Sequence, residues 1–217
     1  MWLFYVKQFL ATLVFIVTAL AMAVTGVVFT SPLVYQFAIN IFDLTAISGL
    51  THEQLMDNYQ QLMAYLTNPT IETLNMPYFS SSEGGLLHFE EVKFLFLMCF
   101  VIAIIGLLMS IAIVFWIHKT KQQAWMGRWF VLGISFPLIL LFFIVIAFDK
   151  VFILFHELLF RNDLWLFSPV TDPVITVLPE GLFMLFFVVA ILIYELIIYA
   201  FRAIALYEQK TKRRQKR

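Results

Sequence analysis

Four long blocks of apolar residues divide the chain, and each block is long enough to cross a lipid bilayer. A transmembrane helix needs roughly 20 consecutive residues to span the hydrocarbon core, and the blocks lack the two-residue alternation of a membrane β-barrel. The pattern therefore predicts an all-α integral membrane protein that forms a single membrane domain over residues 1–217. The four predicted transmembrane helices lie near residues 9–29, 94–117, 129–148 and 181–201.

Composition and charge agree with this prediction and give the chain an orientation. Hydrophobic residues make up 62% of the chain and charged residues 13%, against about 45–50% and about 25% in soluble domains. The segment 30–92 contains acidic residues and no Lys or Arg, whereas the opposite ends of the blocks are basic. The positive-inside rule then predicts that both termini are cytoplasmic. The basic positions are Lys7, Lys119, Lys121, Arg128 and a basic tail over residues 202–217.

The segment 30–92 is expected to form a small extracytoplasmic cap. Residues from Thr51 to Gln54 have the pattern of a capping box, which starts a helix, and apolar residues then recur at helical spacing as far as about Thr67. Pro69 should end this helix, because the residue before a proline disfavours helical backbone. A further short helix near the membrane surface is predicted over residues 32–44.

The second outer segment, residues 149–180, begins with helical periodicity and ends in turns. Its first part, residues 149–160, predicts a bent or re-entrant helix at the outer membrane surface. Asp149 and His156 are seven residues apart, so a helix should place both on one side as a polar stripe. The connection to the last span is expected to be rigid because it contains Pro169, Pro173 and Pro179.

Two outer stretches combine a histidine with carboxylates beside a membrane helix, which makes them candidates for one active site. A histidine near neutral pKa can act as a general base, and a neighbouring carboxylate can orient its ring. Both stretches lie at the outer ends of predicted spans, so they can meet at one depth. We take His88 and His156 as candidate catalytic residues. The candidate supporting residues are Glu91, Glu157, Asp163 and Arg161.

Residue chemistry alone leaves three kinds of function open: histidine acid–base catalysis, a membrane metallohydrolase, and a non-catalytic four-helix scaffold. The two histidines with Glu91 and Glu157 could supply zinc ligands, but Phe160 stands where a His-Glu-x-x-His motif needs its second histidine. Glu195 is a further functional candidate because it lies inside the fourth span. We expect no metal, no cofactor and no nucleic-acid partner.

Two sequence motifs carry a resemblance to a known family. Residues 88–93, His-Phe-Glu-Glu-Val-Lys, resemble a His-x-x-(Asp/Glu)-Val-Lys motif at the head of the second helix. Residues 155–165 resemble a second signature of the same family, which continues through residues 167–173 to residues 178–180. With the four spans and the two outer segments, the chain resembles the lipoprotein intramolecular transacylase (Lit) family of Gram-positive bacteria over nearly its whole length.

The resemblance implies a reaction, a substrate and a location. Enzymes of this family move the sn-2 acyl chain of a diacylglyceryl-cysteine lipoprotein to the α-amino group of that cysteine, which gives a lyso-form lipoprotein. Activity in this family is attributed to two histidines on the outer face, which correspond to His88 and His156. The implied partners are the lipoprotein and the lipids of the bacterial cytoplasmic membrane, with the active site on its outer face. Such an aminolysis needs no nucleophilic Ser or Cys, and the chain has no Gly-x-Ser-x-Gly motif.

Overall fold

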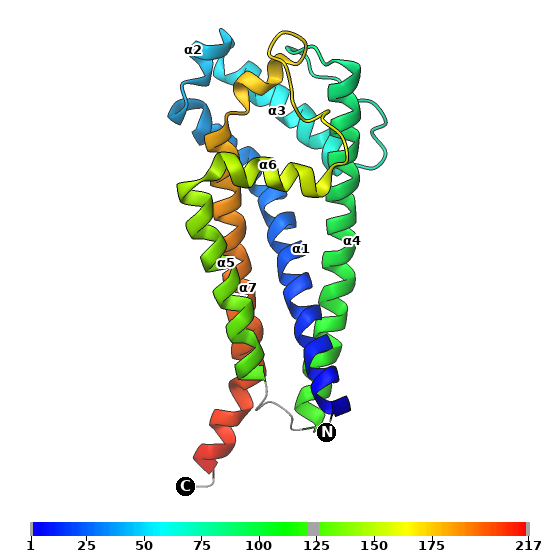
Figure 1. The fold of residues 1–217 in the computed structure, drawn as a ribbon, viewed down its shortest axis with the longest axis vertical. Helices are drawn as coiled ribbons and strands as arrows, with labels where there is room; N and C mark the ends of the chain where they lie inside the picture. Colours follow the sequence, from blue (N-terminus) through cyan, green and yellow to red (C-terminus); the bar gives the residue numbers. More distant parts are fainter. Residues whose placement is uncertain (1, 121–125, 216–217) are drawn as a thin grey trace. The chain divides into compact units, whose positions relative to one another are not determined.

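The structure, a computed structural model, describes residues 2–120 and 126–215. Within these residues every regular element is a helix, so the all-α prediction is confirmed (Figure 1). In chain order the elements are α1 (Trp2–Ile41), α2 (Leu44–Ser48), α3 (His52–Thr67), α4 (Glu83–Thr120), α5 (Met126–Ile146), α6 (Phe148–Leu159), the 3-10 helix η2 (Pro173–Val177) and α7 (Glu180–Gln215).

The helices that are long and apolar enough to cross a membrane match the predicted spans. Parts of α1, α4 and α7 qualify as single helices: Tyr5–Ile41, Glu83–Thr120 and Glu180–Ile204. The fourth candidate span is a broken one, in which the chain bends by 118° between α5 and α6 (Figure 1). The bent outer helix predicted over residues 149–160 is therefore confirmed as α6, and the break falls at Ala147.

The separate short helix predicted over residues 32–44 is wrong for most of its length, because α1 continues through Pro32 to Ile41. Proline has no N–H, so its presence leaves the carbonyl of Val28, four residues earlier, without its usual partner. The Ser31 hydroxyl donates a hydrogen bond of 2.8 Å to that carbonyl. This side-chain bond allows the helix to pass the proline in an apolar environment.

The last helix continues beyond the fourth predicted span. The basic tail expected to follow the fourth span at residue 202 is part of α7, which ends at Gln215. Residues 216–217 of that tail, and residues 121–125 with the predicted cytoplasmic Lys121, lie outside the described part of the chain.

The residues group into two compact units. The first contains Met1–Thr25, Cys99–Phe142 and Val189–Arg217, and the second contains Gly26–Met98 and Phe143–Val188. The boundaries fall inside long helices, and the single-domain organisation stays a prediction. Both candidate histidines belong to the second unit, which is called the site unit below.

The first unit is a close-packed helical core. Phe15 and Phe201 place their ring centroids 5.1 Å apart, and Ser110 donates a hydrogen bond of 3.3 Å to Thr18. A side chain on Gly106 would collide with Thr18, so a glycine is needed there. Glu195, the candidate of the fourth span, is buried in this unit.

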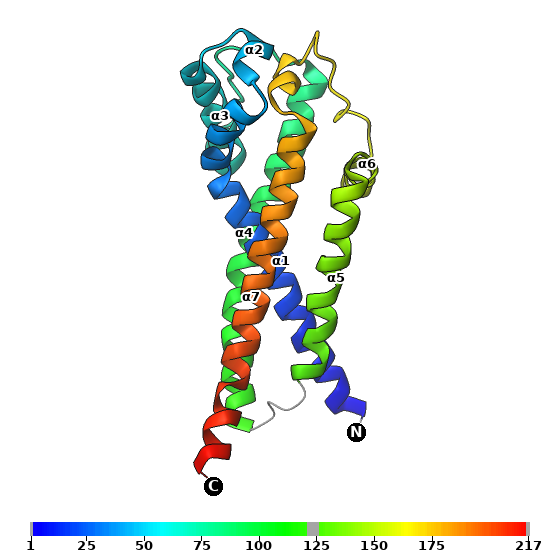
Figure 2. The same cartoon turned by 90° about the vertical axis from the view of Figure 1, so that its left-hand side faces the viewer.

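The helix predicted after Thr51 is confirmed as α3, and the core of the site unit forms around it. Thr51 and Gln54 make both hydrogen bonds of the capping box, and the helix ends at Thr67 before Asn68. The buried face of α3 includes Leu55, Tyr59, Leu62 and Leu66, and the Tyr59 ring stacks on Tyr35 at 4.0 Å. Near this core α2 packs against η2 (Figure 2).

A buried carboxylate ties the loop before η2 to the start of α4. Asp172 accepts hydrogen bonds of 2.8 Å from the Ser82 backbone N–H and 2.7 Å from the Thr171 hydroxyl. A Cβ atom on Gly85 would lie against the same carboxylate, so the close approach requires glycine. Burial raises the pKa of Asp172, but the hydrogen bonds from Thr171 and Ser82 outweigh burial and hold this pKa below its ordinary value.

Candidate active site

His88 lies in the second turn of α4, a few residues after the loop contact at Ser82, and it is buried, with 6% of the residue surface exposed. Two aromatic rings from the segment after α6 pack against the imidazole. The ring centroid of Phe160 lies 4.7 Å from that of His88, and the Phe167 ring meets it edge-on at 5.5 Å. The first candidate histidine is therefore enclosed by apolar rings.

His156 lies on the buried stripe of α6 together with aromatic residues, not on a polar stripe. Phe148, His156 and Phe160 are buried at four-residue intervals, with the partly buried Phe152 between them, whereas Asp149 is exposed. The polar stripe predicted for Asp149 and His156 is therefore wrong. Large apolar residues of α6 such as Leu154 and Leu158 are exposed, so the buried stripe is marked by its aromatic rings and not by apolarity alone.

The environment of His156 fixes its tautomer. Its Nδ1 atom lies 2.7 Å from the carbonyl oxygen of Phe152, and a carbonyl can only accept, so Nδ1 carries the proton. In the neutral ring Nε2 then holds the lone pair. The imidazole also packs between rings, with Phe152 at 4.1 Å and Trp165 stacked at 4.7 Å.

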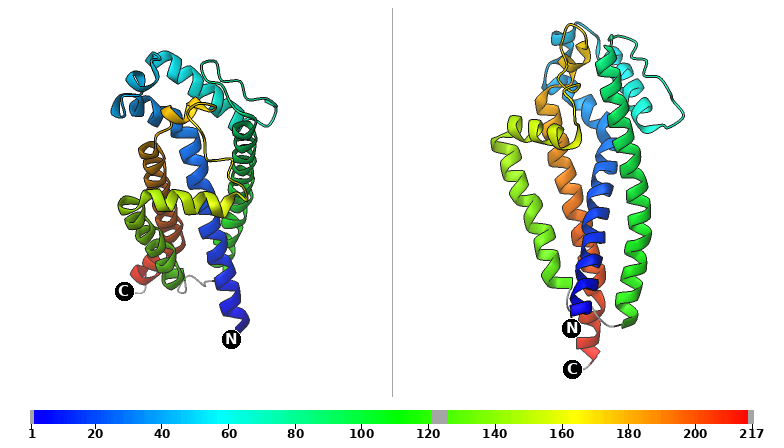
Figure 3. Two further views of the ribbon diagram at one scale, coloured as in Figure 1. Left: turned by 45° about the horizontal axis from the view of Figure 1, so that its top comes forward. Right: turned by 45° about the vertical axis from the view of Figure 1, so that its right-hand side comes forward.

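The two histidines come from separate stretches of chain and meet in the site unit. Their ring centroids are 6.1 Å apart, with 34° between the ring planes. Figure 3 shows how this happens, since the C-terminal end of α6 reaches the N-terminal part of α4 in both views. The predicted convergence of the two histidines is thus confirmed as geometry.

Glu91 lies next to His88, and Asn162 holds it there. The Glu91 Oε2 atom is 3.9 Å from His88 Nδ1, one helical turn away on α4. The Asn162 side-chain amide donates a hydrogen bond of 2.8 Å to Glu91 Oε1, and its own oxygen accepts the Leu164 N–H at 3.1 Å. The Glu91 Oε2 and His88 Nδ1 atoms are both buried without a hydrogen-bond partner among the described residues, so a small shift would join them.

Comparison with known families decides the class of this protein. The family model described as lipoprotein intramolecular transacylase Lit matches residues 9–183. The chain belongs to the Lit family. It is therefore an acyltransferase.

Solved structures of a Lit enzyme share this fold. The in meso structure of the membrane-integral lipoprotein intramolecular transacylase Lit from Bacillus cereus is 29% identical in sequence and has a TM-score of 0.87, covering 95% of this chain and 98% of its own. Two variants of the Bacillus cereus protein, with one histidine replaced by arginine or by alanine, are similar at TM-scores of 0.78 and 0.75. The arginine variant is 26% identical and covers 98% of this chain and 97% of its own. The alanine variant is 29% identical and covers 98% of this chain and 99% of its own. The comparison with curated proteins gave no match.

The remaining predicted site residues of this Lit family member are not buried with the histidines. Glu157, Arg161 and Asp163 are exposed. Within residues 2–120 and 126–215, no group of three or more His, Cys, Asp or Glu side chains is arranged to hold a metal ion. Glu91 is thus the carboxylate of the predicted set that lies beside an imidazole.

Asn162 and the aromatic rings are the parts of the site that the sequence analysis missed. Asn162 follows the end of α6 and contacts a residue 71 positions earlier in the chain, a relation that local spacing does not reveal. Trp165 and Phe167 belong to the second family signature, and this signature was the one sequence feature that could have pointed to them as site residues. The Trp165 indole nitrogen is buried without a hydrogen-bond partner in the described part of the chain.

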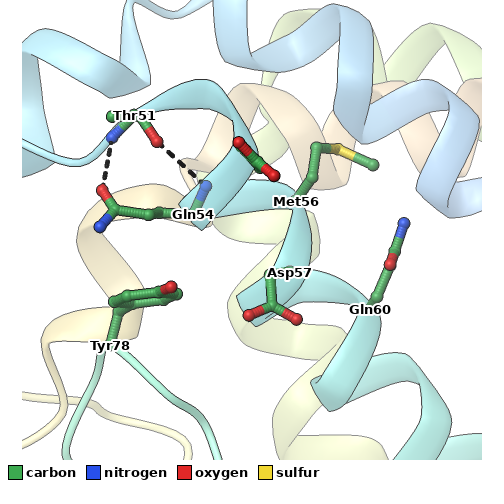
Figure 4. A pocket seen from close by; sticks show the side chains of 7 residues that line it. Thr51, Gln54, Met56, Asp57, Gln60 and Tyr78 are labelled. Carbon is green, nitrogen blue, oxygen red and sulfur yellow. Dashed lines mark hydrogen bonds between the residues drawn. The ribbon is translucent and has the colours of Figure 1, made fainter.

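The site unit also contains a polar hollow that is separate from the histidines (Figure 4). Its volume is about 650 Å³. Its walls come from α3 and from Tyr78, and they include the residues of the capping box. The lining residues are Thr51, Glu53, Gln54, Met56, Asp57, Gln60 and Tyr78.

Proposed function

We propose that this chain transfers the sn-2 acyl chain of a diacylglyceryl-cysteine lipoprotein to the α-amino group of the same cysteine. The observation that carries the proposal is the pair of buried imidazoles, His88 and His156, with ring centroids 6.1 Å apart. Ester aminolysis needs a base for the amine proton and a donor for the developing oxyanion. An imidazole that accepts a proton and a second imidazole that donates an N–H would meet both needs.

His156 is the proposed base. Its Nδ1–H is engaged by the Phe152 carbonyl at 2.7 Å, so the lone pair of the neutral ring is on Nε2 and is free to take a proton. A backbone carbonyl in a helix is a fixed partner, and it also favours the imidazolium that forms when Nε2 is protonated.

His88 is the proposed donor. Glu91, 3.9 Å from His88 Nδ1, is the carboxylate that would orient this ring, in preference to the exposed Glu157 and Asp163. Glu91 at Nδ1 would favour the imidazolium that forms when the His88 ring receives the amine proton, and the Nε2–H of that ring would then steady the oxyanion and protonate the leaving glycerol oxygen. Arg161, which is exposed, is proposed to contact a lipid headgroup or a peptide carbonyl of the substrate.

The proposed reaction balances without a covalent intermediate on the enzyme. The amine nitrogen forms a bond to the acyl carbon, the bond from that carbon to the glycerol oxygen breaks, and one proton passes from nitrogen to the glycerol oxygen through the imidazoles. Nucleophile and ester belong to one substrate molecule, so the main task of the enzyme is to bring them together. We place the reaction at the outer face of the bacterial cytoplasmic membrane, where both substrate groups meet the lipid surface.

The test is expression in a bacterial host that makes only diacylglyceryl lipoproteins with a free amine. Acyl migration leaves the mass unchanged, so N-terminal lipopeptides must be fragmented by tandem mass spectrometry to find the N-acyl group. The intact chain should convert the lipoprotein, and the His88→Ala and His156→Ala variants should not. His52→Ala, at the first residue of α3, is the matched control and should convert it fully.

Two outcomes would favour the alternative functions. Full conversion by both histidine variants would remove the catalytic proposal and leave the scaffold hypothesis. Loss of conversion after treatment of the purified protein with a chelator, restored by zinc, would favour the metal hypothesis.

A further inference from the structure

Aromatic rings from one short segment cover both imidazoles of the site. The Phe160 ring is shared, with its centroid 4.7 Å from that of His88 and 5.7 Å from that of His156. Trp165 stacks on His156, and Phe167 meets His88 edge-on. Only 6% of the surface of His88 and 9% of that of His156 is exposed. Water therefore has little access to either ring.

This exclusion of water bears on the proposed reaction, because a base that deprotonates an amine can also deprotonate water. An N-terminal amine has an ordinary pKa of about 7.7–8.0, so near pH 7 most substrate molecules carry an ammonium that cannot attack. The ester is then bound beside a base while the amine is still protonated. Any water at His156 could attack the acyl carbon during that time, and closed active sites prevent side reactions of this kind.

We propose that Phe160, assisted by Trp165 and Phe167, keeps water from the imidazoles and so directs the acyl chain to the amine instead of to water. This inference rests on the function proposed above. Without these aromatic rings, the same site should act as a lipoprotein esterase. Water would form the new bond to the acyl carbon, and the bond to the glycerol oxygen would break. His156 would accept the proton of water, and the glycerol oxygen would gain one. The products would be a free fatty acid and a lyso-lipoprotein with a free amine.

The decisive variant is Phe160→Ala, which removes the ring shared by both histidines and leaves the histidines unchanged. Purified full-length protein in lipid vesicles would receive a synthetic diacylglyceryl-cysteine peptide in water enriched in oxygen-18. Mass spectrometry would measure the N-acyl product and the free fatty acid. The ratio of hydrolysis to transfer should rise by about tenfold, equivalent to roughly 1.4 kcal/mol between the two barriers. The released fatty acid should contain oxygen-18.

Phe148→Ala is the matched control, because Phe148 lies on the same buried stripe of α6 and its ring packs on Phe152 and Phe187 at 5.8 Å. It should leave the product ratio as in the unmodified chain, even if the rate falls. Phe160→Leu keeps an apolar side chain at the shared position, and its ratio should stay nearer that of the unmodified chain. If Phe160→Ala does not fold, Phe167→Ala replaces it, since Phe167 is only partly buried and should tolerate truncation.

The outcomes separate the two proposals. A slower Phe160→Ala or Phe167→Ala variant with an unchanged ratio would overturn the water-exclusion proposal, and so would an equal rise in Phe148→Ala. If the unmodified chain forms no N-acyl product from this peptide, the proposed function itself fails.

Discussion

At the residue scale, the carboxylate of Glu91 is shared unequally between two partners. Asn162 donates to one oxygen at 2.8 Å, whereas the other oxygen is 3.9 Å from His88 Nδ1, too far for a hydrogen bond. The Glu91 Oε2 and His88 Nδ1 atoms are both buried without a hydrogen-bond partner among the described residues. Each is therefore available to form a hydrogen bond with the other. Asn162 therefore limits where the carboxylate can go, and we regard it as a positioning residue that acts through Glu91.

This role predicts that Asn162→Asp lowers the rate of acyl transfer. The change keeps the oxygen that accepts the Leu164 N–H but replaces the donor to Glu91 with a second carboxylate. A hydrogen bond to a charged group contributes about 1.5–3 kcal/mol, so we expect roughly a tenfold or greater fall in kcat. Initial rates with the synthetic lipopeptide would measure it.

The matched control is Asn68→Asp, at the end of α3, which should keep the normal rate. In a Glu91→Gln background, Asn162→Asp should have little further effect, because residues acting through one contact are not additive. Independent, additive losses would contradict the positioning role.

At the element scale, the contact between Asp172 and Ser82 joins the loop before η2 to the first turn of α4. That turn precedes His88, so the contact supports the helix that bears one imidazole. The folded pKa of Asp172 lies below its ordinary value. The stability it contributes is therefore fully present above the ordinary pKa, about 3.9, and is lost as the pH falls through the lower folded pKa.

Asp172→Asn should accordingly destabilise the protein at pH 7 and much less in acid. A charged hydrogen-bond acceptor contributes about 1.5 kcal/mol or more, which should appear as a lower thermal unfolding midpoint in detergent at pH 7. The difference from the unmodified chain should shrink as the pH falls below about 4. Asp149→Asn, at an exposed position of α6, should show no such difference at either pH. If the difference in unfolding midpoint between Asp172→Asn and the unmodified chain stays constant down to pH 2, Asp172 does not stabilise the protein as an ionised carboxylate.

Elements with local signals were predictable from sequence, and elements that depend on distant contacts were not. The capping box at Thr51 gave the start of α3 because its two hydrogen bonds are local. The passage of α1 through Pro32 was missed, since it depends on the Ser31 hydroxyl replacing a backbone donor. In the site, each histidine was found from its neighbours in sequence, whereas Asn162 and the shared ring of Phe160 act on residues about 70 positions away.

At the scale of the whole molecule, the charge distribution predicts which side of the membrane each connection faces. The segment 30–92 has no Lys or Arg, and basic residues follow the second and fourth spans. Positive charge is retained on the cytoplasmic side during insertion. An even number of spans, with α5 and α6 together as a broken one, would keep both termini on that side and put the site on the other.

Cysteine accessibility provides the test of this topology, because the sequence contains one cysteine, Cys99. In a Cys99→Ser background, new cysteines would be introduced as Thr73→Cys and Lys119→Cys, both at exposed positions. A membrane-impermeant maleimide should label Thr73→Cys in intact cells and Lys119→Cys only after permeabilisation. The background chain without a new cysteine should remain unlabelled. The reverse pattern would place the histidines on the cytoplasmic face, away from lipoproteins displayed outside, and the proposed substrate could then not reach them.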